Sequence, residues 1–313
     1  MTIRAELPTR DPANSLSTAK PDLRRSVPVG DAEMAYIDIG DGDPIVFLHG
    51  NPTSSFLWRN VIPHVRGMGR IVAPDFIGHG WSSTSPRDAY RYPDNIEYFD
   101  AFFEALDLKR NVILVLHDWG AAVGFHRAAR FPEHIRGIAY MEAMVRPRRW
   151  TDFTPERVEQ FKWIRSPDAD HALLEENLFV EVMLFERGII RDLSEAEKQV
   201  YRYATDRPGG TRLPGLVMPR DIPFDGEPAD CHELVRFYSD WLAESRVPKL
   251  FVNADEGHGL AGAARDFARS LKNQTEITVH ARHYLQEDAP DEIGAALAQF
   301  VAANSGDIRG RPL

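Results

Sequence analysis

Short apolar segments alternate with longer amphipathic segments along most of the chain, and this alternation predicts strands connected by helices. The run Ile45-Val-Phe-Leu48, for example, is fully apolar, as is typical of a parallel strand buried on both faces. The pattern predicts strands at residues 32–39, 45–48, 71–73, 138–141, 249–253 and 276–279, and one more in the first half of residues 111–130.

Amphipathic segments between these strands predict the helices. Helices are expected at residues 56–65, 94–106 and 233–242, from about Leu260 onward, and after Pro290. Because strands and helices alternate, the expected fold is α/β, with a doubly wound, mostly parallel sheet. In such a sheet the ligand binds at the carboxyl ends of the strands.

The alternation stops after Glu142, and arginine, glutamate and scattered aromatic residues then recur at helical spacing. Residues 155–163 and 172–185 are the clearest examples and are predicted helices. We therefore predict a helical cap domain, or lid, inserted into an α/β core, and a flexible arm at the polar, proline-interrupted start of the chain. The predicted boundaries are 1–25 for the arm, 26–146 and 226–313 for the core, and 147–225 for the cap.

The composition is that of a globular protein, with 43% hydrophobic and 27% charged residues among 313. A net charge of −10, without a run of Lys and Arg, makes nucleic acid an unsuitable partner and favours a small neutral substrate. No run of about eighteen apolar residues occurs, so no membrane span is expected. The single cysteine, Cys231, excludes an internal disulfide and suits a reducing compartment, so we expect a cytoplasmic protein in which Cys231 packs.

Residues 111–130 join a β-branched apolar run to an Ala-rich run of small residues, which predicts a strand, a sharp turn and a helix. Asp118 occupies the turn. A carboxylate there would lie at the carboxyl edge of a buried strand and at the positive end of a helix, near free backbone N–H groups. Two interpretations are open from this segment alone: Asp118 is a reactive group, or it only caps the helix.

Short motifs stand at the predicted strand ends and at the borders of the cap: His49-Gly-Asn-Pro-Thr-Ser-Ser55, Trp58-Arg-Asn60, Ala73-Pro-Asp-Phe-Ile-Gly-His-Gly80, His117-Asp-Trp-Gly120, Tyr140-Met-Glu-Ala143, Pro219-Arg-Asp-Ile-Pro223 and His283-Tyr-Leu-Gln-Glu-Asp-Ala-Pro290. This set resembles the haloalkane dehalogenases, specifically their second subfamily, and the turn at Asp118 resembles the nucleophile elbow of the α/β-hydrolases. The resemblance extends from about Val27 to Ala302 and thins between Tyr201 and Leu216. It implies an α/β-hydrolase fold and a dehalogenase reaction, but no substrate preference.

The resemblance implies a two-step reaction that needs no cofactor and no metal. Asp118 would attack an sp3 carbon, which forms an alkyl ester and releases halide. The side-chain N–H of Asn51 and the indole N–H of Trp119 would hold the halide, and the backbone N–H groups of the same two residues would hold the later oxyanion. The expected partners are a small halogenated hydrocarbon, water and halide, with a primary alcohol as product. No nucleic acid or membrane partner is expected, and the protein is expected to be a monomer or a homodimer.

His283 is the candidate base, because it follows the last predicted strand, where the histidine of this fold comes last in the chain. Glu142, in the motif after the strand that precedes the cap, is the preferred acid to orient His283. Asp255, after a later strand, stays the alternative acid, and a third interpretation makes it only a loop cap. His49 and His117 flank the predicted site and are expected to pack or to form hydrogen bonds.

Three other functions share parts of this pattern. An epoxide hydrolase also uses an aspartate elbow and a final histidine, and Tyr201 and Tyr203 are candidates for the cap tyrosines that it needs. A coelenterazine luciferase of the sea-pansy type, a monooxygenase, resembles the same family, although Pro52 and the motif at residues 219–223 argue against it. A ligand receptor is the non-enzymatic alternative, which an intact nucleophile, base and halide pair disfavours.

Overall fold

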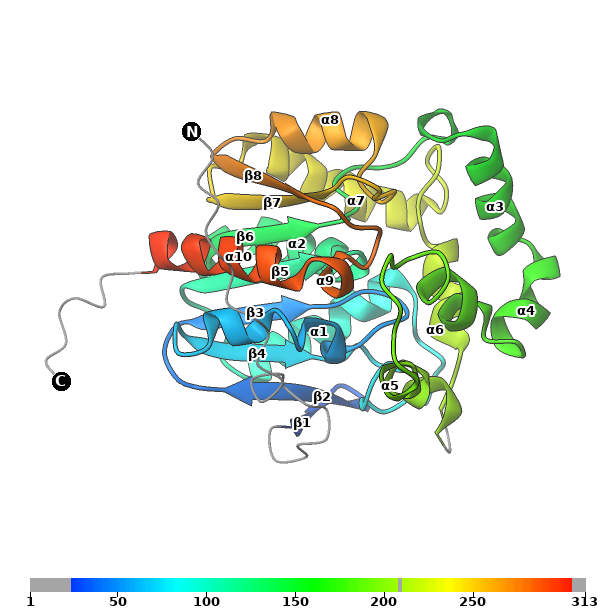
Figure 1. The fold of residues 1–313 in the computed structure, drawn as a ribbon, viewed down its shortest axis with the longest axis horizontal. Coiled ribbons are helices and arrows are strands. Elements are labelled where there is room, and N and C mark those ends of the chain that lie inside the picture. The colour runs from blue at the N-terminus through cyan, green and yellow to red at the C-terminus, as the bar shows by residue number, and fades with distance from the viewer. Residues whose placement is uncertain (1–23, 208–209, 306–313) are drawn as a thin grey trace, which may run out of the picture.

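The computed structural model describes residues 24–207 and 210–305, which contain an eight-stranded sheet in the order β1-β2-β4-β3-β5-β6-β7-β8 (Figure 1). β2 pairs antiparallel with β1 and β4, and the other neighbouring strands pair in parallel. The predicted α/β architecture with a mostly parallel sheet is therefore confirmed. The strands are β1 (Arg24–Val29), β2 (Ala32–Ile39), β3 (Pro44–Leu48), β4 (Arg70–Pro74), β5 (Val112–His117), β6 (Ile135–Met141), β7 (Lys249–Ala254) and β8 (Gln274–Val279).

Helices cover both faces of this sheet, and its central strands are therefore buried along their length. In β3, Val46 and Leu48 belong to the apolar cluster on one face, whereas Ile45 and Phe47 belong to the cluster on the other. This division follows from the strand geometry, in which successive side chains point to opposite faces. The first face packs against α1 (Tyr92–Ala105), α2 (Trp119–Arg130), α7 (Ala229–Glu244) and α8 (Gly262–Ser270), and the second against α9 (Leu285–Asp288) and α10 (Pro290–Asn304).

Between β6 and α7 the chain leaves the sheet and forms helices beyond the carboxyl ends of the parallel strands, coloured green to yellow in Figure 1. They fall within the predicted cap segment, whose boundaries at residues 147 and 225 stay a prediction. No helix in the described ranges is long and apolar enough to cross a membrane. The helical elements of this segment are η6 (Trp150–Asp152), α3 (Pro155–Arg165), η7 (Pro167–Ala169), α4 (Asp170–Leu174), η8 (Phe179–Leu184), α5 (Glu195–Asp206) and α6 (Leu213–Arg220).

Two predicted helices are divided in the structure. Residues 56–65 form two 3-10 turns, η3 (Ser55–Trp58) and η4 (Ile62–Val65), because Pro63 lacks an N–H and disfavours a continuous helix before it. Residues 172–185 are divided between the end of α4 and the π-helical η8, because Asn177 adopts a φ of 55° that a right-handed helix does not allow. One further 3-10 turn, η5 (Pro132–His134), connects α2 to β6.

Of the predicted arm at residues 1–25, residues 1–23 lie outside the described residues, and Arg24 and Arg25 begin β1. β1 pairs with β2 from Arg24 opposite Ile37 to Val29 opposite Ala32. The two strands therefore form an antiparallel hairpin at the edge of the sheet.

The order of the strands reverses between β3 and β5, and this reversal positions the site. From β3 the chain passes to β4 on one side, and β5 later returns to the other side of β3. The loops that follow β3 and β5 therefore separate, which leaves a crevice at the carboxyl ends of these strands. Asn51 lies in the first of these loops, and Asp118 follows β5 directly.

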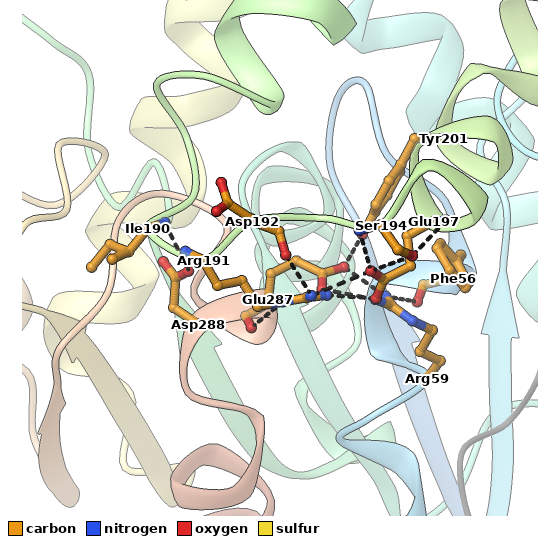
Figure 2. A network of polar contacts seen from close by, with 10 residues as sticks. All are labelled: Phe56, Arg59, Ile190, Arg191, Asp192, Ser194, Glu197, Tyr201, Glu287 and Asp288. Atoms are coloured by element: carbon orange, nitrogen blue, oxygen red, sulfur yellow. Dashed lines mark hydrogen bonds and ion pairs between the residues drawn. The ribbon is translucent and has the colours of Figure 1, made fainter. Parts of the chain in front are cut away.

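A buried ionic network connects the core to the cap segment (Figure 2). Glu287 in α9 has no exposed surface, and its carboxylate accepts bonds from Arg59 at 2.6 and 2.8 Å and further bonds from Arg191 and the Tyr201 hydroxyl. Glu197 in α5 bridges the same two guanidinium groups, each at 2.7 Å. Since α9 begins two residues after His283, the network holds the segment that positions this histidine.

Replacing Glu287 by glutamine should destabilise the fold, because the buried guanidinium of Arg59 and the partly buried one of Arg191 would lose a shared counter-charge. We expect the free energy of unfolding, measured by denaturant titration, to fall by about 3–5 kcal/mol. The matched control is Glu233→Gln, which removes a carboxylate from an exposed pair with Arg236 and should change stability by less than about 1 kcal/mol. Equal effects of the two substitutions would contradict a structural role for the buried network.

Candidate active site

Asp118 lies at the tip of the turn between β5 and α2, with a φ of 51° and a ψ of −121°. A non-glycine residue in this region stores strain of about 1–3 kcal/mol, and such residues concentrate at functional sites. Other parts of the chain pack so closely around this turn that Gly50 and Gly120 have no room for a Cβ atom. A Cβ at Gly50 would collide with the Asp118 carboxylate, and a Cβ at Gly120 would collide with the carbonyl oxygen of Leu48.

The Asp118 carboxylate lies between a backbone donor and an imidazole. The backbone N–H of Asn51 donates to Oδ1 at 3.0 Å, and Nε2 of His283 lies 3.6 Å from Oδ2. Burial acts to raise the pKa of Asp118, but the hydrogen bond and the positive charge of His283 outweigh burial and lower it. The carboxylate is therefore held in its ionised, nucleophilic form.

The other ring nitrogen of His283, Nδ1, lies 3.0 Å from Oε2 of Glu142, which follows β6 with a φ of 46°. The backbone N–H groups of residues 258–260 also donate to the Glu142 carboxylate, at 2.9, 2.6 and 3.2 Å. Burial would raise the pKa of Glu142, but the bonds to His283 and to this loop lower it to about 2. Burial would likewise lower the pKa of His283, but Asp118 and Glu142 raise it to about 9.

Asp255, the alternative acid, does not lie beside His283. Its carboxylate accepts the backbone N–H of Ala281 at 3.0 Å and lies 3.0 Å from Nδ1 of His280. Its side chain is 44% exposed, whereas that of Glu142 is 1% exposed. The geometry thus brings Glu142 rather than Asp255 to His283, and the contacts of Asp255 are those of a loop residue.

Asn51 and Trp119 line the same cavity as Asp118. Nδ2 of Asn51 is buried and has no hydrogen-bond partner among the described residues. Oδ1 of Asn51 lies 3.1 Å from Nε2 of His79, and burial lowers the pKa of His79 to about 3. Oδ1 can only accept, so this contact is a hydrogen bond when the single N–H of neutral His79 is on Nε2; Nδ1 of the same ring lies 3.3 Å from the carbonyl oxygen of Ile77. A buried donor without an acceptor costs about 1–3 kcal/mol, so the amide N–H group is suited to a bound anion.

The cavity in front of Asp118 has a volume of about 130 Å³. Much of its wall is apolar and comes from the cap segment and its border. The apolar side chains include Phe153, Phe161, Ile164, Phe179, Met183 and Ile222. Polar and charged side chains that sequence reasoning did not single out also line it, namely Arg148, Arg157, Gln160, Arg187, His258 and Tyr284.

The histidines around the triad have different tasks. Nε2 of His49 accepts the backbone N–H of Phe76 at 2.9 Å, and Nε2 of His117 donates to the carbonyl oxygen of His283 at 2.8 Å, so both have the structural contacts expected for them. The ring of His258 stacks on His283 at 4.8 Å, and burial lowers its pKa to about 3. Sequence reasoning missed His79 and His258. Both follow the carboxyl ends of strands, β4 and β7, which is the signal that could have found them.

Three side chains of the site have the composition of a metal centre, since ligand atoms of Glu142, His258 and His283 lie within 4.8 Å of one another. Both oxygens of Glu142, however, already accept backbone N–H groups, and Oε2 also faces Nδ1 of His283. These contacts suit an acid that orients an imidazole better than they suit a metal ligand.

Comparisons with known proteins identify the family of this chain. Residues 43–216 match the family model of the alpha/beta hydrolase fold. A haloalkane dehalogenase of Sphingobium indicum is 49% identical over 281 residues, which cover 89% of this chain and 95% of that protein. One from Mycolicibacterium smegmatis is 48% identical over 273 residues, which cover 86% of this chain and 87% of that protein. The crystal structure of the haloalkane dehalogenase DbeA from Bradyrhizobium elkani, 38% identical, matches 90% of this chain and 97% of that one with a TM-score of 0.83. The chain therefore belongs to the haloalkane dehalogenases, α/β-hydrolases that remove halogen from haloalkanes by hydrolysis.

Proposed function

We propose that Asp118 is the nucleophile that displaces halide from an sp3 carbon. The observation that carries this proposal is the position of its carboxylate, which lies at the strained tip of the elbow, lines the cavity and is kept ionised by His283. An ionised carboxylate attacks carbon without first losing a proton, as a serine hydroxyl must. The attack forms an alkyl ester on Asp118 and releases halide.

The leaving halide is stabilised by the side-chain N–H of Asn51 and the indole N–H of Trp119. Neutral donors that are fixed in advance stabilise the charge that develops in the transition state. The buried Nδ2 of Asn51 has no other partner in the described residues, and Trp119 lines the cavity beside the nucleophile. His79 is a positioning residue here, because its bond to Oδ1 fixes the orientation of the Asn51 amide.

His283 activates the water that hydrolyses the ester, and Glu142 orients His283 through Nδ1. When Asp118 becomes an ester, it loses the negative charge that helps to raise the pKa of His283. The pKa of His283 then falls, so the neutral imidazole can accept a proton from water. The backbone N–H groups of Asn51 and Trp119 hold the oxyanion, and the products are a primary alcohol, halide and a proton.

The alternative of an epoxide hydrolase requires cap tyrosines that face the substrate. Tyr201 instead bonds to Glu287, and Tyr203 stacks on Trp81 at 5.2 Å. Neither lines the cavity that the described residues form in front of Asp118. The luciferase and receptor alternatives lose support, because curated haloalkane dehalogenases are 43–49% identical to this chain over most of its length.

We further infer the domain roles and the setting of the enzyme. Residues 147–225 act as a cap, because α3 and η8 contribute much of the cavity wall, and residues 26–146 and 226–313 act as the catalytic core. The single cysteine, Cys231, is a free, buried thiol, which supports a cytoplasmic setting. We expect a monomer or a homodimer.

The two-step mechanism is tested by separating its steps with His283→Phe. Attack by Asp118 does not use His283 as a base, and His117 and the backbone N–H of Trp119 also lower the pKa of Asp118, whereas hydrolysis requires the base, so the ester should accumulate. With 1-bromohexane, this variant should release about one bromide per protein and then stop, which ion chromatography would measure. Mass spectrometry should find one added hexyl group on the peptide that contains Asp118, and Asp118→Ala should show no adduct. Steady turnover, or an adduct on another residue, would disprove the mechanism.

The role of the acid is tested by comparing Glu142→Gln with Asp255→Asn. The first change keeps the shape of the side chain but removes the charge that stabilises the imidazolium of His283. Hydrolysis should therefore slow by on the order of 10²- to 10⁴-fold, and much more than alkylation, in single-turnover measurements. Asp255→Asn is the matched control and should leave both steps near their wild-type rates. The opposite result would transfer the role to Asp255.

The pH dependence should differ between kcat/KM and kcat. The value of kcat/KM depends on ionised Asp118, whose pKa is lowered. It should therefore persist until the pH falls below the usual carboxyl range near 3.9. The second also requires neutral His283 in the ester intermediate, so kcat should be lost as the pH falls through the pKa of that histidine. The acid limb of kcat should thus lie at higher pH than that of kcat/KM in bromide-release assays. Coincident acid limbs would contradict His283 as the base of the second step.

A further inference from the structure

The cavity contains three guanidinium groups that the proposed mechanism does not use. Arg148 follows β6, Arg157 belongs to α3, and Arg187 follows η8, yet all three line the same cavity as Asp118. Within residues 24–207 and 210–305, no carboxylate oxygen lies within 4.0 Å of any of these guanidinium groups. Arg187 is exposed, so it lies where the cavity meets solvent.

The bonds that these arginines make do not compensate their charge. Nη2 of Arg148 donates to the carbonyl oxygen of Gly259 at 2.8 Å, and Nη1 of Arg157 donates to the side-chain oxygen of Gln160 at 2.8 Å. Burial lowers the pKa of Arg148, and burial followed by the charge of Arg148 lowers the pKa of Arg157. Arg148 and Arg157 are partly buried, and a cation withdrawn from water is normally paired with an anion, as Arg59 is with Glu287 in this protein. Among the described residues, no carboxylate contacts either of these two guanidinium groups.

The carboxylates of the site supply only part of the counter-charge for these arginines. Asp118 and Glu142 share the imidazolium of His283, whose pKa they raise to about 9, so these three groups together carry one negative charge, which acts on Arg148 without contacting it. The three guanidinium groups in the wall of the cavity exceed this charge, within a chain whose net charge is −10. A concave site whose charge opposes that of the whole protein concentrates anions.

We propose that this cavity accepts haloalkanes that carry a carboxylate at the end opposite the halogen, with Arg148 and Arg157 as the carboxylate-binding residues. The inference rests on the proposed function, in which Asp118 attacks the carbon that bears the halogen. Planar guanidinium groups suit a carboxylate, because they donate two parallel N–H bonds to its oxygens. The apolar cap side chains of the same cavity, such as Phe161 and Phe179, suit the methylene chain between the two ends.

The chemistry at Asp118 is unchanged for such a substrate. In an ω-bromoalkanoate, the carbon–bromine bond breaks as the bond between a carboxylate oxygen of Asp118 and carbon forms, and bromide leaves with the bonding electrons. Water then hydrolyses the ester, which regenerates Asp118 and yields an ω-hydroxyalkanoate and a proton. The carboxylate of the substrate takes no part in either step and contributes only binding.

The experiment compares kcat/KM for 6-bromohexanoate with kcat/KM for 1-bromohexane, both measured by bromide release, and extends to longer pairs of the same series. The wild-type enzyme should favour the bromoacid. Arg157→Gln should lower the ratio of the two kcat/KM values by about 10- to 100-fold, chiefly through the KM of the bromoacid, because a charged hydrogen-bonding partner is lost. Arg148→Gln should act in the same direction, and the double variant should lower the ratio further.

The matched control is Arg246→Gln, which makes the same change in net charge at an exposed residue before β7, outside the lining of the cavity. This variant should keep the wild-type ratio. Hexanoate should also inhibit turnover of 1-bromohexane competitively in the wild type, and hexan-1-ol should do so far less. Three results would overturn this inference but not the proposed function. The wild-type enzyme could convert 1-bromohexane without favouring the bromoacid, or Arg157→Gln could leave the ratio of the two kcat/KM values unchanged. The ratio could also fall equally in Arg157→Gln and Arg246→Gln. Absence of bromide release from either substrate would instead overturn the proposed function.

Discussion

The site depends on keeping two carboxylates ionised where burial favours their neutral forms. Asp118 and Glu142 lie on opposite sides of one imidazole, and the pKa of each carboxyl is lowered while that of His283 is raised. Each carboxylate also accepts backbone N–H groups, from Asn51 in one case and from residues 258–260 in the other. The charges are therefore stabilised by donors that are fixed before any substrate enters, which is the arrangement that the proposed alkylation and hydrolysis require.

The fold maintains this arrangement by holding backbone in conformations that few residues adopt. Asp118 and Glu142 both have a positive φ at the ends of adjacent parallel strands, β5 and β6, and β5 is buried along its length. His283 comes from a separate loop whose position depends on α9. The buried network around Glu287 holds α9 against both the core and the cap segment, so the segment that carries His283 is held by ion pairs to residues far from it in sequence, such as Arg59 (Figure 2).

The cavity combines two kinds of surface that have different origins. The core contributes the carboxylates, the imidazole and the amide N–H groups. The cap segment and its border contribute apolar side chains together with Arg148, Arg157 and Arg187, whose charges have no carboxylate partner within 4.0 Å in the described ranges. Because the reacting groups and the groups that meet the rest of the substrate lie on separate elements, the cap can change specificity without disturbing the reaction.

Much of this protein follows from local patterns in the chain. Runs of β-branched residues and the helical periodicity between them predict the strands and the α/β architecture, because hydrophobic burial acts through short-range periodicity. Family resemblance and residue type were also enough to select Asp118, Asn51, Trp119, Glu142 and His283 as candidates. Local patterns failed where a single residue outweighed periodicity, as Pro63 and Asn177 did when they divided two predicted helices.

Only the tertiary structure brings Glu142 rather than Asp255 to His283, because both follow strands of the same sheet and differ in which loop lies opposite His283. It also revealed the contacts of His79 and His258 and the three arginines that line the cavity. The contact between His258 and Glu142 joins residues 116 positions apart, and the contact between His79 and Asn51 joins two loops 28 positions apart. Contacts between such separate segments leave no periodicity in the chain.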